Sequence, residues 1–337
     1  MTSLGSSVVA FTDKDYPCED YNDYPSAFCD LENENLFPIS KFLMFRKDTP
    51  AAREAYNLIR PATLLISRII LQCWETFGLF VRRESAGSSD MFLGADAELK
   101  LPKDEVIACI KSALPDIDFD PDMSANFSSF AETRLLPDSK QDLIVLDYGL
   151  VRLLKSTSSH SQKLSGLLYL AVLIGHELAH TLEFRSIRKG KLVSHDKPFG
   201  TPPGVTGREA GTAWETRAFG GKIFPVCEVE NVLRDIRGLC IRSSSWNFDM
   251  MKANGAWIRR LFKEQHWMTE KRPLQPPIDT YALCAVFEDE LISGPSTPTK
   301  PERHEKDVVL QSCYPKSPKK KRIMSVPMST CGGKKVG

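Results

Sequence analysis

The sequence predicts an α+β fold that is mostly helical, in which a small sheet and a following helix pack around one buried helix. Residues 164–182 contain no proline and are apolar almost throughout, which is typical of a helix buried on all sides. Residues 142–147, just upstream, are rich in aliphatic and β-branched side chains and predict a strand. The uncharged part of the helix, residues 164–175, is too short for a membrane span, which needs about 20 residues.

Further helices are expected on both sides of this core. Residues 51–81 carry apolar side chains at helical spacing, and Pro61 should break or kink that helix. Residues 103–114, 229–236 and 248–262 are also expected to be helical. The flanking helices suggest no chemistry.

The buried helix contains the motif His-Glu-Leu-Ala-His at residues 176–180. Because a helix turns once per 3.6 residues, His176 and His180 lie on one face and both imidazoles can reach one metal ion. Glu177 lies about 100° round the helix, where it can accept a proton from a metal-bound water. HExxH is the spacing of zinc hydrolases. We therefore expect one Zn²⁺ per chain, with His176 and His180 as ligands and Glu177 as general base.

A catalytic zinc usually has three protein ligands and leaves the fourth position to water. A third histidine six residues after His180 is excluded, because that position is Ser186. A second helix, expected over residues 207–221 after a loop at 185–206, offers Glu209 and Glu215 instead.

Only one of these two glutamates should bind the metal, because a spacing of six residues points them about 120° apart on a straight helix. We favour Glu215, whose rotamer Trp214 and Phe219 can fix by packing. Glu209 is the alternative; it lies beside glycine at the expected helix start, where a carboxylate can act simply as a cap.

Residues 140–225 resemble gluzincin-type metallopeptidases, whose third ligand is a glutamate on a later helix. They look most like a set of fungal proteins with an HELxH helix and an ExGxxxE-like segment, here residues 209–215, ending in Phe219-Gly220-Gly221. They are similar, more distantly, to ImmA/IrrE-type metallopeptidases, whose second motif is echoed by Glu215, Ala218 and Phe219. The resemblance implies a zincin-like core and hydrolysis of peptide bonds.

Two supporting roles stay open. The acidic residue that thermolysin-like motifs carry four positions after the glutamate ligand is missing, so Glu183, Asp147 or the unused glutamate would have to orient a ligating histidine. A donor to the developing oxyanion could be His195 or His266, and His195 could instead be the third ligand.

The folded domain is expected to span residues 39–292. It would comprise a helical N-terminal part (39–139), a metal-site core (140–225) and a helical C-terminal part (226–292). Residues 1–38 should form an acidic flexible arm, since residues 1–36 hold eight acidic side chains against Lys14.

Residues 293–337 contain ten basic and three acidic side chains and are expected to form a basic disordered tail. Lys319, Lys320, Lys321 and Arg322 in this tail resemble a nuclear import signal, which suggests an import carrier as a partner. The remainder of the chain carries a net negative charge, so no nucleic-acid groove is expected.

Nine cysteines without a CxxC pair favour reduced thiols in an intracellular protein. The first 16 residues lack the features of a signal peptide. We expect the cytoplasm, with the nucleus as an alternative, and neither secretion nor membrane insertion.

The sequence thus favours a zinc metallopeptidase that acts on peptide or protein substrates. The alternative is a catalytically weak or inactive zinc-binding module of zincin fold that acts as a regulatory or interaction protein. A third interpretation is a structural core without metal, in which hydrogen bonds satisfy both histidines.

Overall fold

The computed structural model describes residues 29–81, 101–123, 130–134, 142–157, 159–187, 209–227, 236–243 and 250–276. The tail with its basic run at 319–322, His195 and residues 1–28 of the expected acidic arm lie outside these residues. The end of that arm is part of the fold, because Leu31, Leu36 and Phe37 are buried in the main core. The expected boundary at residue 38 is therefore too late: the apolar side chains of residues 31–37 already pack inside.

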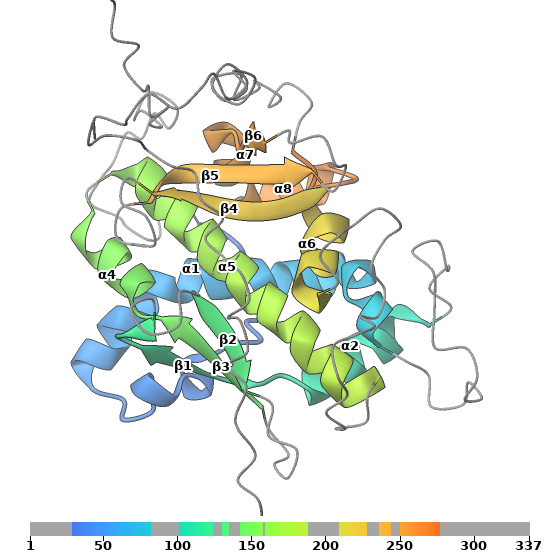
Figure 1. The fold of residues 1–337 in the computed structure, drawn as a ribbon, viewed down its shortest axis with the longest axis horizontal. Helices are drawn as coiled ribbons and strands as arrows, with labels where there is room; N and C mark the ends of the chain where they lie inside the picture. Colours follow the sequence, from blue (N-terminus) through green and yellow to red (C-terminus); the bar gives the residue numbers. More distant parts are fainter. Residues whose placement is uncertain are drawn as a thin grey trace, which may run out of the picture.

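Helix α5 (His160–Leu182) runs through the centre of the molecule (Figure 1). The Ser159 side chain caps its start by accepting a hydrogen bond from the Gln162 N–H, and nearly every later residue is buried. By length and composition the segment His160–Arg185 could cross a membrane, but 94% of its apolar window is buried inside the protein. This burial is what the core helix of a folded domain shows, as the all-round apolar pattern predicts.

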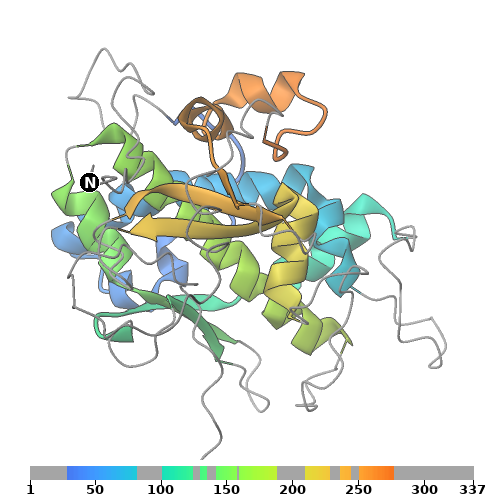
Figure 2. The ribbon, with the colours of Figure 1, turned by 45° about the horizontal axis from the view of Figure 1, so that its top comes forward.

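Two small sheets lie on either side of α5 (Figures 1 and 2). The first has the order β1-β3-β2, with β1 (Asp116–Asp120) parallel and β2 (Ala131–Arg134) antiparallel to β3 (Leu143–Asp147). The expected strand at 142–147 is thus confirmed as β3.

The second sheet is antiparallel throughout, in the order β4-β5-β6. Its strands are β4 (Gly221–Cys227), β5 (Ile236–Ser243) and β6 (Met250–Lys252). Strands β4 and β5 contact α5, and four buried apolar side chains of these strands join the main core: Ile223, Ile236, Leu239 and Ile241.

The other helices surround this core. They are α1 (Pro50–Gln72), α2 (Lys103–Ser112), α4 (Gly149–Ser156), α6 (Ala210–Phe219), α7 (Gly255–Leu261) and α8 (Glu264–Thr269). Short 3₁₀ turns lie at Ile39–Lys41, Leu43–Phe45, Trp74–Thr76 and Gly78–Phe80, and a π-helical turn, Glu183–Ile187, follows α5. The mostly helical α+β class expected from the sequence is confirmed.

Helix α1 does not break at Pro61, contrary to one of the two outcomes expected from the sequence. Proline lacks an N–H and costs a helix one hydrogen bond. Both neighbouring apolar residues, Ile59 and Ala62, are fully buried, and α1 packs on α5 and α4. Tertiary packing therefore compensates for the lost hydrogen bond, and α1 continues past Pro61.

The helices expected at 229–236 and 248–262 are corrected by the structure. Ile236 begins strand β5, and residues 228–235 are outside the described part of the chain. Strand β6 takes up the start of the second segment, and only α7 remains helical there. The Asn254 side chain sets this boundary, because it accepts hydrogen bonds from the Ala256 and Trp257 N–H groups and so starts α7.

Helices α5 and α6 approach each other at two glycines. A Cβ built on Gly175 of α5 would lie 2.2 Å from the Trp214 ring of α6. A Cβ on Gly211 of α6 would lie 2.2 Å from the His176 ring of α5. Neither contact leaves room for a methyl group, so both glycines are needed for the close approach.

We predict that Gly175→Ala destabilises the protein by about 1–3 kcal/mol, because the rigid Trp214 ring cannot move aside as a flexible side chain would. Gly166→Ala is the matched control on the same helix, since its Cβ would meet only flexible leucine side chains, the nearest being the end of Leu153 at 2.9 Å. Denaturant unfolding of both variants measures the difference. Equal stability of the two variants would contradict the prediction.

Candidate metal centre

His176 and His180 lie on the same face of α5, with ring centroids 5.3 Å apart. The His176 side chain is 4% exposed and the His180 side chain 24% exposed, so the pair runs from the core toward the surface. The expected pairing of the two imidazoles is confirmed.

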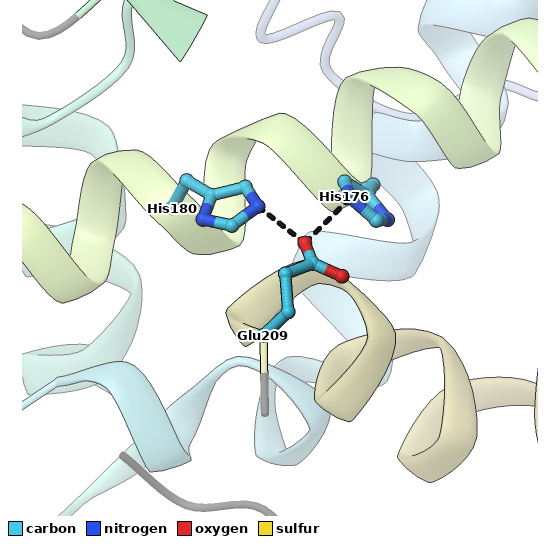
Figure 3. Close-up of side chains that lie close together, drawn as sticks. All are labelled: His176, His180 and Glu209. Atoms are coloured by element: carbon cyan, nitrogen blue, oxygen red, sulfur yellow. Dashed lines mark hydrogen bonds and ion pairs between the residues drawn. The ribbon is translucent and has the colours of Figure 1, made fainter. Parts of the chain in front are cut away.

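Glu209 joins them from the start of α6 (Figure 3). Its Oε1 lies 2.7 Å from Nε2 of His176 and also bonds to Nε2 of His180. The three candidate ligand atoms lie within 4.8 Å of one another, and this group could hold a metal ion. The Glu209 side chain is 35% exposed, so the group is reachable from one side.

Glu209 is also the N-cap of α6. Its Oε2 accepts hydrogen bonds from the N–H (3.1 Å) and the hydroxyl of Thr212, and its Oε1 lies 3.2 Å from the Gly211 nitrogen, which donates to it. A cap stabilises the helix start, and here it also fixes the carboxylate that faces both histidines. Capping and metal binding, considered as alternatives from the sequence, are compatible in one side chain.

Glu215 contacts the opposite nitrogen of His176. Its Oε1 lies 2.6 Å from Nδ1 of His176, and its Oε2 accepts a 2.6 Å hydrogen bond from the Ile223 N–H. The side chain is fully buried. With Nδ1 donating to this carboxylate, Nε2 is the nitrogen of His176 that can bind a metal once it has lost its proton.

The preference for Glu215 as third ligand is therefore not supported, and Glu209, the alternative, takes that place in the group. The two carboxylates are separated, with Glu209 at the extended N-cap position and Glu215 inside α6. Each reaches a different nitrogen of His176, because Gly211 lets α6 pass directly over that ring.

Glu215 also fills the supporting role that the sequence left open, since it is the unused glutamate and orients a histidine. Asp147 accepts a hydrogen bond from the Gly149 N–H at the start of α4, and Glu183 lies buried in the π-helical turn.

His266, a candidate donor to the oxyanion, is buried in α8. Its Nε2 contacts the Pro273 carbonyl at 3.0 Å, which is a structural bond.

Glu177 is buried on α5, and its carboxylate is held by a residue that the sequence did not point to. The Thr133 hydroxyl of β2 donates to Oε2 of Glu177 at 2.6 Å. A lone threonine in a four-residue strand carries no motif that could have indicated this contact. Gly211 could have been found, since a glycine inside the ExGxxxE segment indicates a close approach.

The ionisable groups of the site shift one another's pKa values. Burial opposes the imidazolium form of His176, but the carboxylates of Glu209 and Glu215 outweigh burial and raise its pKa to about 10. Burial likewise opposes a charged His180, and Glu209 raises the pKa of that ring. Burial would raise the pKa of Glu209, yet His176 and His180 hold it well below the usual value.

The residues fit a zinc ion. Two imidazole nitrogens and one carboxylate oxygen form a donor set typical of catalytic zinc, and Glu215 gives His176 the outer carboxylate partner common in such sites. Zinc bonds of about 2.0–2.1 Å would separate tetrahedral ligand atoms by roughly 3.4 Å. The 2.7 Å contact between His176 and Glu209 would therefore widen by less than about 1 Å on binding.

Comparison of the chain with protein-family models, with curated proteins and with solved structures found no match.

We predict that Glu209→Ala loses stoichiometric zinc, whereas Glu215→Ala binds zinc about 10–100-fold more weakly, because it loses only the support of His176. Competition with a coloured chelator measures both affinities. The reverse order, with zinc lost in Glu215→Ala and kept in Glu209→Ala, would restore Glu215 as the ligand.

Metal uptake should also release protons. Since the pKa of His176 is about 10 in the metal-free protein, the ring is protonated at pH 7.5 and must lose its proton to bind a metal. The apparent affinity should rise with pH, by about tenfold per unit for each proton released, until the pH passes the pKa of His176. Calorimetry of zinc binding in buffers of different ionisation enthalpy counts the protons, and a value of zero at pH 7.5 would contradict the prediction.

Proposed function

We propose that the protein is a zinc metallopeptidase of gluzincin type with a zincin-like core. The observation that carries the proposal is the convergence of Glu209, from the start of α6, with His176 and His180 of α5 beside Glu177. A small sheet packed on a buried HExxH helix, with the third carboxylate on a later helix, is the arrangement that the resemblance to gluzincins implies.

Zinc held by His176, His180 and Glu209 would supply a Lewis acid that makes water acidic enough to lose a proton near neutral pH. Glu177 would accept that proton as the water attacks a peptide carbonyl, and would pass it to the leaving amine. Glu215 would keep Nε2 of His176 directed at the metal throughout. The substrate would be a peptide or protein.

Glu177→Gln should leave zinc bound and reduce peptide hydrolysis by at least about 100-fold, because the amide cannot accept the proton. Zinc content and cleavage of a quenched-fluorescence peptide library are measured on the same preparations of wild type and variant. Equal cleavage by both would remove Glu177 as the base. Wild-type protein that holds zinc yet cleaves no peptide would favour the non-catalytic binding module instead.

A further inference from the structure

Thr133 links strand β2 to the carboxylate expected to act as the base. Its hydroxyl oxygen lies 2.6 Å from Oε2 of Glu177, although the two residues are 44 positions apart in the chain. Among the described residues, this is the one hydrogen bond that the Glu177 carboxylate receives. Both acceptors that the described part of the chain places within hydrogen-bond distance of the Thr133 hydroxyl belong to Glu177: its carboxylate and its main-chain carbonyl.

Contacts among β2, β3 and α5 fix the position of Thr133. Strand β2 lies against α5 and pairs with β3, where Thr133 is opposite the fully buried Ile144. Just before β3, both carboxylate oxygens of Asp142 accept hydrogen bonds from Arg185, at 2.6 and 2.7 Å. Arg185 follows α5, so the helix, the ion pair and the two strands together hold Thr133 beside Glu177.

This contact gives the Glu177 carboxylate a fixed orientation. A glutamate side chain has several rotamers, and a hydrogen bond to a charged group is strong enough to select one. Because Thr133 engages Oε2, Oε1 remains for a water molecule. The Thr133 hydroxyl also lies 3.1 Å from the Glu177 carbonyl oxygen, a second acceptor on the same residue.

We propose that Thr133 is a positioning residue that holds the Glu177 carboxylate with Oε1 directed at the reacting water. The proposal rests on the proposed function, in which Glu177 is the base. A merely structural threonine on β2 would affect folding but would not act through Glu177.

The test compares hydroxyl-deleted and hydroxyl-retaining variants of the full-length, zinc-loaded protein. Thr133→Val removes the hydroxyl and keeps the branched shape, whereas Thr133→Ser keeps the hydroxyl. Thr181→Val is the matched control, because the Thr181 hydroxyl donates to the main-chain carbonyl of Glu177, at 3.2 Å, and not to its carboxylate. Zinc content and circular dichroism first establish that each variant is folded and loaded.

Two measurements are made on each variant. The first is kcat and KM for one peptide cleaved by the wild type. The second is the calorimetric affinity for acetohydroxamate, which gives up a proton to a nearby base when it chelates zinc and therefore reports the position of Glu177 without turnover. The same affinity is measured for Glu177→Gln and for the double variant with Thr133→Val.

We expect Thr133→Val to lower kcat by at least about 10-fold with KM within about twofold, and to weaken acetohydroxamate binding about 10-fold. Thr133→Ser and Thr181→Val should remain near the wild type in both measurements. In the Glu177→Gln background, Thr133→Val should have no further effect on acetohydroxamate affinity, because the two residues act as one unit.

Wild-type values for Thr133→Val, or an equal loss in Thr181→Val, would overturn the proposal for Thr133. If the wild type binds zinc and acetohydroxamate but cleaves no peptide, the proposed peptidase function fails, while the affinities still decide the role of Thr133. A wild type that binds no zinc would overturn both.

Discussion

Helix α6 passes across α5 with no side chain between the backbone of Gly211 and the His176 ring, and the site depends on this contact. At this distance Glu209, at the start of α6, reaches Nε2 of both histidines, while Glu215, two turns later, reaches Nδ1 of His176. One turn after Gly211, the Trp214 ring of α6 packs against Gly175 of α5, and this second contact fixes how the two helices are aligned. A methyl group at either glycine would move both carboxylates together, because one rigid helix carries them.

The two carboxylates that contact His176, those of Glu209 and Glu215, differ in burial and in their hydrogen-bond partners. Glu209 is partly exposed, caps α6 and faces the position that a metal would share with His180. Glu215 is fully buried, and its second oxygen is held by the N–H of Ile223 in β4, so it cannot turn toward the position between the two histidines. The second sheet therefore contributes to the candidate metal site, since β4 fixes the residue that orients His176.

Much of this site could be predicted from the sequence. The HExxH spacing pointed to both histidines and Glu177, and the ExGxxxE segment offered two glutamates as the third ligand, with His195 as a further candidate. Choosing between them depended on which face of α6 meets α5, and the close approach at Gly211 decides this in three dimensions. Thr133 could not be predicted, because its contact with Glu177 joins a four-residue strand to a helix 44 positions later. Strand β6 was missed because tertiary pairing outweighed local helix propensity at residues 250–252.

X-ray absorption spectroscopy of the zinc-loaded protein tests the metal site most directly. We expect two imidazole nitrogens and light oxygen ligands at about 2.0–2.1 Å, with the multiple-scattering signal of two histidines. A sulfur ligand at about 2.3 Å, a single imidazole, or no bound zinc would contradict the assignment of His176, His180 and Glu209 as the ligands.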